Sequence, residues 1–106
     1  MAVIAVLTNL PDSESAFNLA RDLVRLRLAA CANVLAPATS FYRWEGRDEK
    51  TIEFPVLIKS TRGCYAKLEQ AIRDRHPHAL PEIIAWNIDA GLPEYLAWVE
   101  SEVTPA

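Results

Sequence analysis

The stretch Ser40–Ser60, SFYRWEGRDEKTIEFPVLIKS, decides how this chain folds. Two runs of β-branched and aromatic residues flank a polar turn with Gly46 at its centre, where a residue that tolerates a positive φ is favoured. These two arms predict a long β-hairpin. Its aromatic surface exceeds what a chain of 106 residues covers with its own helices. We therefore expect part of the hairpin to pack against another copy of the molecule.

The length and composition predict a single domain over residues 1–106. The net charge of −3, with no cluster of Lys or Arg, argues against nucleic acid as a partner. The first residues lack the basic region and the apolar length of a signal peptide. No apolar run approaches the ~20 residues of a membrane span. We expect a cytoplasmic protein with no membrane association.

The residues on either side of the hairpin alternate between strand and helix patterns. In chain order they predict a strand at 3–8, a helix at 13–27, a strand at 28–35, the hairpin, a helix at 64–75, a strand at 82–88 and a helix from Pro93. Residues 28–35 have helical propensity, but a helix of typical length precedes them and Pro37 follows, which favours a strand. The predicted inner face of the last helix is Leu92, Tyr95, Leu96 and Val99.

This order is the split βαβ, ferredoxin-like pattern of the α+β class: βαββαβ plus a C-terminal helix, with an antiparallel sheet and helices on one face. The other face of such a sheet needs a cover. The last helix together with a neighbouring subunit would provide one, and closed cyclic assembly is the economical expectation.

Two cysteines, Cys31 and Cys64, stand in a chain with no export signal. A disulfide between them is therefore not expected, and each is interpreted as a reduced core residue. Metal binding or thiol chemistry is the alternative for both.

Candidate metal ligands come from three separate parts of the chain: Cys31, Glu45 in the hairpin, and the connector with His76, His78 and Glu82. Thiolate and imidazole suit copper or zinc, and a carboxylate can complete the shell. The spacing forms no recognised metal motif. His76 could equally satisfy the end of the preceding helix, His78 could face solvent, and Cys31 among alanines could be a small core residue.

Lys59 and Glu82 each end an apolar strand, where they could form an ion pair, line a pocket with Glu45 or reach solvent. Tyr42 and Trp44 are interpreted as interface anchors, because aromatic residues dominate interface cores. No nucleophile elbow, P-loop or dinucleotide fingerprint is present. The sequence specifies no reaction.

The chain resembles the CutA (CutA1) divalent-cation tolerance family along nearly its whole length. The matching segments are Val6-Leu7-Thr8, Pro11-Asp12-x-Glu14-Ser15-Ala16, Leu28–Val34, Ser40–Gly46, Leu57–Thr61, Tyr65-x-x-Leu68-Glu69-x-x-Ile72, His76-Pro77, Pro81–Ala85 and Gly91-x-x-x-Tyr95-Leu96-x-Trp98.

The resemblance implies a homotrimer of ferredoxin-like protomers, with long hairpins packed across subunits. It implies tolerance of copper and other divalent cations, binding of Cu(II) or a related cation, and no catalytic activity. The family's cleft positions fall on Cys31, Tyr42, Trp44, Glu45, Lys59, His76 and Glu82. Three alternatives stay open: a trimeric signalling or protein-interaction module similar to the PII proteins, a structural trimer without a specific ligand, and an enzyme that uses Glu45, Lys59, His76 and Glu82 as acid–base groups.

The chain departs from the family pattern at two places. His78 replaces the usual Tyr after His-Pro and is followed by Ala79, where an acidic residue is common, so the inherited ligand set is altered. Pro55 interrupts the second hairpin arm, which predicts a sheet edge or a bulge nearby.

Overall fold

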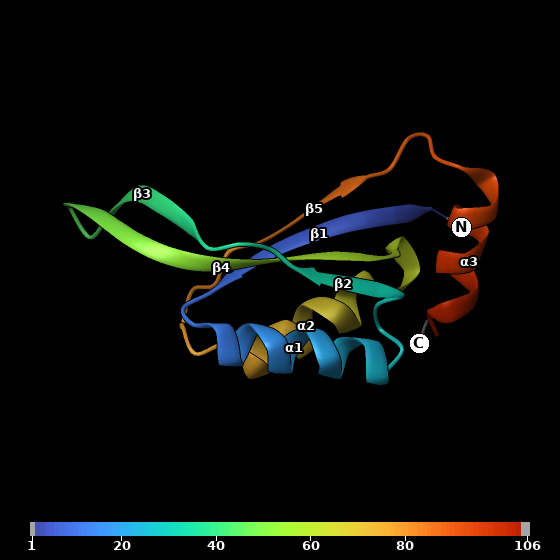
Figure 1. The fold of residues 1–106 in the computed structure, drawn as a ribbon, viewed down its shortest axis with the longest axis horizontal. Coiled ribbons are helices and arrows are strands. Elements are labelled where there is room, and N and C mark those ends of the chain that lie inside the picture. The colour runs from blue at the N-terminus through green and yellow to red at the C-terminus, as the bar shows by residue number, and fades with distance from the viewer. Residues whose placement is uncertain (1, 105–106) are drawn as a thin grey trace.

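Strand β1 (Val3–Leu10) lies inside the sheet with a strand on each side, and all its residues except Leu7 and Asn9 are buried. The computed structural model describes residues 2–104, and its antiparallel sheet of five strands has the order β2-β4-β1-β5, with β3 paired to β4 (Figure 1). The other elements are α1 (Ser13–Arg25), β2 (Cys31–Val34), β3 (Ala38–Trp44), β4 (Arg47–Thr61), the 3₁₀ turn η1 (Arg62–Cys64), α2 (Tyr65–Arg75), β5 (Ile83–Asn87) and α3 (Pro93–Glu102). The predicted ferredoxin-like architecture is confirmed.

The hairpin of β3 and β4 closes through a two-residue turn, Glu45-Gly46, with φ of 50° and 80°. Positive φ at both positions is the geometry of a type I′ turn, whose twist matches the flanking strands. The turn is shorter than the polar segment suggested, because Arg47–Thr61 all belong to β4. The hairpin extends from the body of the protein (Figure 1). With the hairpin included, the protein measures 44 × 25 × 22 Å.

Pro55 lies where β4 changes its partner. β2 pairs with Val56–Lys59 and β3 with Arg47–Glu53, so the missing N–H of Pro55 falls between the two ladders. In the segment between β2 and β3, three residues, 35–37, lie opposite only two residues of β4, Phe54 and Pro55. The pairing register therefore shifts by one residue, as it does at a β-bulge. The irregularity expected near Pro55 is therefore found, on the facing strand.

Helix α1 begins at a capped N-terminus. The Ser15 backbone N–H donates to Asp12 Oδ1 at 2.7 Å. Hydrogen bonding from this N–H, and to a smaller extent from the Ser15 side chain, lowers the pKa of Asp12 from its ordinary 3.8.

We expect Asp12→Ala to lower the melting temperature at neutral pH, because one N–H of the first turn loses its acceptor. A lowered native pKa means that the carboxylate stabilises the fold above about pH 4 and that this contribution is lost as the pH falls through the native pKa. The difference between wild type and Asp12→Ala should thus shrink in acid. Thermal melts at pH 7 and pH 3 measure it, with Ser13→Ala as the neighbouring control; a pH-independent difference would contradict it.

The end of α1 is tied to the end of α3. Arg27 has φ 60°, and the bonds Leu28 N–H to Leu23 O and Arg27 N–H to Val24 O form a Schellman motif. The Arg27 guanidinium donates to Thr104 Oγ1 and to the Ser101 carbonyl, and Arg27 O accepts from the Thr104 N–H. These bonds fix a non-glycine residue in the left-handed region and anchor α3.

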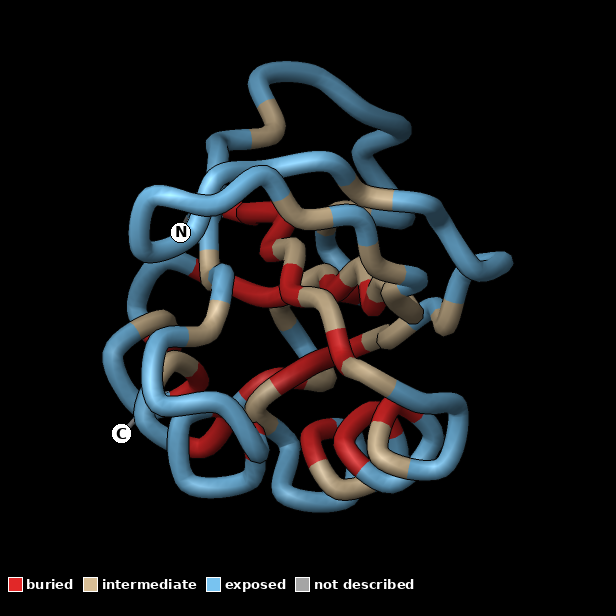
Figure 2. The backbone as a smooth tube through the Cα atoms, turned by 90° about the vertical axis from the view of Figure 1, so that its left-hand side faces the viewer, coloured by how far each residue is buried: buried red, intermediate tan, exposed pale blue. Residues whose placement is uncertain are grey.

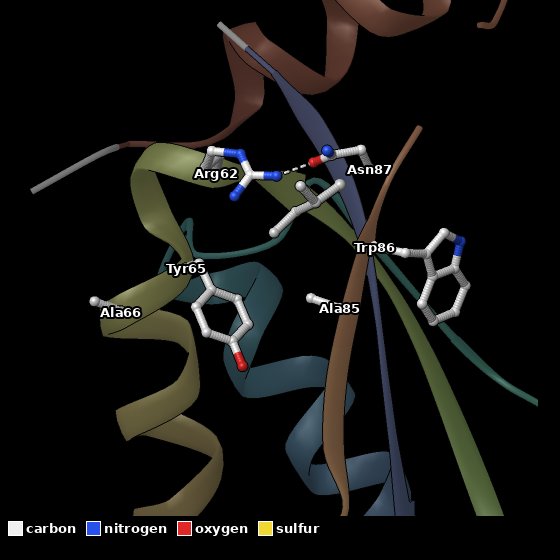
Figure 3. Close-up of a pocket in the computed structure, with 7 residues that line it drawn as sticks. Arg62, Tyr65, Ala66, Ala85, Trp86 and Asn87 are labelled. Atoms are coloured by element: carbon white, nitrogen blue, oxygen red, sulfur yellow. Dashed lines mark hydrogen bonds between the residues drawn. The ribbon is translucent and has the colours of Figure 1, made fainter. Parts of the chain in front are cut away.

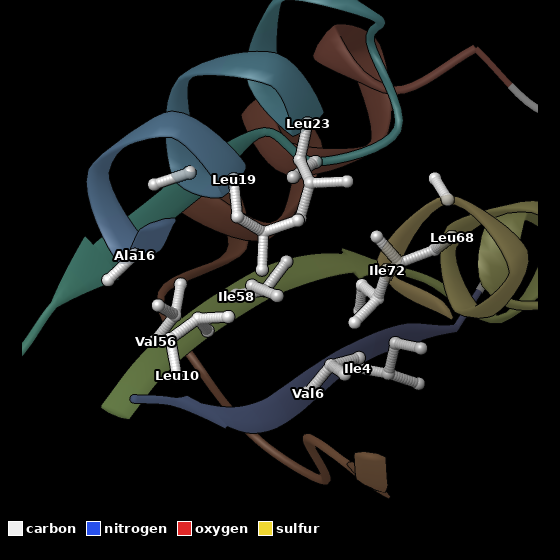
Figure 4. Packing of buried hydrophobic residues seen from close by; sticks show 13 residues of the cluster. Ile4, Val6, Leu10, Ala16, Leu19, Leu23, Val56, Ile58, Leu68 and Ile72 are labelled. Atoms are coloured by element: carbon white, nitrogen blue, oxygen red, sulfur yellow. The ribbon is translucent and has the colours of Figure 1, made fainter. Parts of the chain in front are cut away.

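Helices α1 and α2 cover one face of the sheet. Figure 4 shows Leu19 and Leu23 of α1 directed at Val56 and Ile58 of β4. Buried residues lie between these layers, while the hairpin is largely exposed (Figure 2). No helix within residues 2–104 has the length and apolar character to cross a membrane.

The opposite face of the sheet is covered at one end only. Val99 and Val103 pack there against Val3, Ala30 and Cys64. Leu92 and Tyr95, predicted for the inner face of the last helix, are exposed, and Leu96 is half-buried. That part of the prediction is wrong, because α3 packs through its C-terminal half near the end of the sheet.

Candidate functional site

A groove of about 730 Å³ opens between the hairpin and the connector that leads from α2 to β5. Its walls combine aromatic and apolar side chains with imidazoles and carboxylates. The lining residues are Asn9, Ser40, Phe41, Tyr42, Trp44, Glu53, His76, His78, Ala79, Leu80 and Glu82. The structure thus brings five of the predicted site residues to one place: Tyr42, Trp44, His76, His78 and Glu82.

His76 is the buried member of this groove, with 8% of its surface exposed. Its Nδ1 accepts the backbone N–H of His78 at 3.1 Å, so Nε2 carries the proton and donates to the Asn9 carbonyl at 2.6 Å. Both ring nitrogens therefore have partners within the chain. A metal ion would have to displace one of these bonds to bind His76.

His78 and Glu82 are more available. The exposed His78 ring lies 5.1 Å from the His76 ring, and its nitrogens make no hydrogen bond within residues 2–104. Glu82 accepts from Asn9 Nδ2 through Oε1 at 2.9 Å. Asn9 thus contacts both His76 and Glu82, and it holds the connector against the end of β1.

Cys31 and Lys59 lie outside the groove. They are cross-strand partners on the face of the sheet opposite α1 and α2, and both contact Asn33: Lys59 Nζ donates to its Oδ1, which also lies 3.6 Å from the Cys31 Sγ. Burial, with a smaller contribution from the nearby Cys31, raises the pKa of Tyr95. Lys59 pairs with Cys31 on one side and with Ala5 of β1 on the other. Ala5 lies four residues, or about 13 Å, along β1 from Asn9, whose carbonyl accepts from His76. The structure does not bring Cys31 and His76 together within one chain.

Glu45 occupies the hairpin turn, one residue beyond Trp44, and does not line the groove. The ion pair considered for Lys59 and Glu82 does not form, because Lys59 binds Asn33 and Glu82 binds Asn9. Within residues 2–104, no three His, Cys, Asp or Glu side chains converge closely enough to hold a metal ion. The two cysteines are free thiols, Cys64 buried and Cys31 half-buried; Cys64 Sγ donates to the Thr104 carbonyl, and burial raises its pKa.

Sequence reasoning missed Asn9 and Glu53, which also line the groove. Asn9 follows an apolar strand, at the position where polar side chains often reach a site, and this signal could have identified it. Glu53 lies between the apolar residues Ile52 and Phe54 in an alternating strand pattern, and nothing in that pattern indicates that its side chain faces the connector.

Large aromatic residues remain exposed on the hairpin and on the uncovered face of the sheet. They are Phe41, Tyr42 and Trp44 on β3, Trp86 on β5, and Tyr95 and Trp98 on α3. Exposed apolar surface of this extent is typical of an interaction site.

The chain matches known proteins over most of its length. The family described as CutA1 divalent ion tolerance protein matches residues 4–102. The divalent-cation tolerance protein CutA of Thermus thermophilus is 40% identical over 94 residues, which cover 89% of this chain and 91% of that protein.

Solved structures agree. A CutA1 crystal structure from Oryza sativa superposes with a TM-score of 0.96 at 28% identity, covering 100% of this chain and 97% of that one. A structure from Archaeoglobus fulgidus, described as a periplasmic divalent cation tolerance protein CutA, has a TM-score of 0.92 at 31% identity and covers 96% and 99%. With the fold, the hairpin and the ordered motifs already in place, this chain belongs to the CutA1 divalent ion tolerance protein family.

Proposed function

We propose that the chain assembles as a homotrimer and binds Cu(II) or a related divalent cation in clefts between its subunits. The proposed role is binding without a chemical step, in the cytoplasm. The observation that carries it is the groove beside the hairpin, where the His78 imidazole and the Glu82 carboxylate lie among exposed aromatic residues.

The donor types favour a borderline transition metal. Imidazole nitrogen suits Cu(II) and Zn(II), and carboxylate oxygen completes mixed shells. Two donors from one chain leave positions for water and for groups of a neighbouring subunit. Within one protomer, Cys31 and Glu45 lie apart from the groove, so we propose them only as ligands that a neighbouring subunit supplies. We propose His76 as a ligand only if one of its hydrogen bonds is replaced by a bond to the metal.

The exposed aromatic side chains support the assembly. Tyr42 and Trp44 border the groove and belong to the extending hairpin, so a subunit packed on them would close the groove from the open side. Removing this apolar surface from water is the driving force for association.

His76 and His78 form a matched pair for the test, two residues apart in one connector. We expect His78→Ala and Glu82→Gln each to weaken copper binding at least tenfold while keeping the melting temperature of the wild type. We expect His76→Ala to lower the melting temperature instead, because the partly buried Asn9 carbonyl and the His78 backbone N–H lose their partners.

Competition titrations of copper against a chromophoric chelator measure the affinity, and thermal melts without metal measure stability. Glu94→Gln, an exposed carboxylate in the first turn of α3, serves as the control. Copper affinities that match the wild type in both His78→Ala and Glu82→Gln would rule out this site.

A further inference from the structure

A second hollow lies between α2 and β5, away from the groove. It has a volume of about 470 Å³ and is lined by Ile4, Arg62, Tyr65, Ala66, Ala85, Trp86 and Asn87. Figure 3 shows the Tyr65 ring and Ala85 across the opening from each other, while the indole of Trp86 points to the other side of β5.

The hollow stays open on the side of β5 because Ala85, an exposed residue, carries only a methyl group there. Helices α1 and α2 cover β4 and β1, and β5 at the edge of the sheet turns Ala85 toward α2. The first turn of α2 lines the hollow with Tyr65 and Ala66, and the Ala66 methyl points away from Ala85 (Figure 3). Buried Ile4 forms an apolar part of the wall.

One end of the hollow carries a positive charge. The Arg62 guanidinium donates through Nη2 to Asn87 Oδ1, a neutral acceptor (Figure 3). No carboxylate between residues 2 and 104 forms an ion pair with Arg62, and no acidic residue lines the hollow. Burial, with a smaller contribution from the nearby Glu69, raises the pKa of Tyr65. The remaining guanidinium N–H groups therefore offer donors without an anionic partner in this part of the chain.

We infer that this hollow binds a small organic monocarboxylate whose apolar body is a ring or a short branched chain. Its volume falls within the range of small-molecule sites, roughly 300–1,000 Å³. Arg62 pairs with the carboxylate through its planar donor fork, and the body packs on Ile4, Ala85 and the Tyr65 ring. A single guanidinium beside a neutral amide matches one negative charge, whereas a phosphate dianion would leave one charge uncompensated. This site goes beyond the proposed cation binding and shares no residue with it.

Benzoate and its neutral isostere benzamide are the probes, titrated into the ¹⁵N-labelled full chain and followed by amide chemical shifts. We expect benzoate to shift the amides of residues 62–66 and 85–87 saturably, and benzamide to bind at least tenfold more weakly. Arg62→Gln should weaken benzoate at least tenfold and leave benzamide unchanged. Arg47→Gln, at an exposed arginine in the hairpin, should change neither.

Ala85→Leu fills the hollow from β5 and provides a second test that leaves Arg62 in place. It should abolish benzoate binding while copper affinity keeps its wild-type value, which separates this site from the groove. The inference is overturned if benzoate and benzamide bind equally well, if Arg62→Gln and Ala85→Leu both retain wild-type benzoate affinity, or if no saturable shift occurs in these residues up to about 10 mM.

Discussion

Replacing Trp44 with alanine is expected to release monomers at protomer concentrations at which Trp98→Ala remains assembled. Trp44 ends β3 beside the hairpin turn, at the end of the hairpin farthest from the body of the protein (Figure 1). An aromatic anchor at the centre of an interface typically costs about 2 kcal/mol or more on truncation. Because each interface of a closed trimer would lose this free energy, the protomer concentration at which the trimer dissociates would rise strongly.

Trp98 is a matched control for this change. The two indoles are similarly exposed in one chain, 47% for Trp44 and 43% for Trp98, so their removal costs a single protomer comparable packing. Trp98 already has an aromatic neighbour in its own chain, Tyr95, with ring centroids 5.6 Å apart. A difference in assembly between the two variants would thus report on contacts between chains.

Sedimentation velocity over a dilution series measures the effect, with circular dichroism to show that both variants are folded. We expect the wild type and Trp98→Ala to sediment as trimers where Trp44→Ala shows a slower species. An intact Trp44→Ala trimer at the lowest concentration would remove Trp44 from the proposed interface.

The architecture could be predicted because local signals along the chain agree with each other. The apolar run of β1 and the positive-φ turn at Gly46 each specify an element by themselves. The choice of a strand for Cys31–Val34, against its helical propensity, was correct because Pro37 and the preceding helix limited the alternatives. Element order then left few topologies to consider.

Features that depend on contacts distant in sequence could not be predicted. The ring nitrogens of His76 are satisfied partly by Asn9, 67 positions away, and Glu82 is held by the same residue. Nothing in the spacing of these residues specifies that arrangement. The groove residues Tyr42, Trp44, His76, His78 and Glu82 were selected, but their separation from Cys31 and Lys59 follows only from the strand register.

The exposed side of α3 shows the limit of periodicity. A stripe at Leu92, Tyr95, Leu96 and Val99 has helical spacing, yet the side that packs is set by the place where the helix meets the sheet. The bonds from Arg27 to Ser101 and Thr104 fix that place. Leu92 and Tyr95 are therefore left exposed in the single chain.

The largest effect on folding is expected from Leu23→Ala. Leu23 is fully buried on α1 and points at the sheet beside Leu19 (Figure 4). Truncation removes apolar contacts and leaves a cavity between two rigid layers, which costs about 2–5 kcal/mol. A domain of this size has a free energy of unfolding of roughly 5–15 kcal/mol, so the variant would lose a large part of its stability.

Leu26→Ala makes the same chemical change three residues later, at the exposed end of the helix. We expect it to alter the free energy of unfolding by no more than about 0.5 kcal/mol. Urea unfolding of wild type and both variants must be compared at one protomer concentration, because assembly adds to apparent stability by mass action. Equal losses in Leu23→Ala and Leu26→Ala would show that the packing of α1 on the sheet does not govern the stability of this fold.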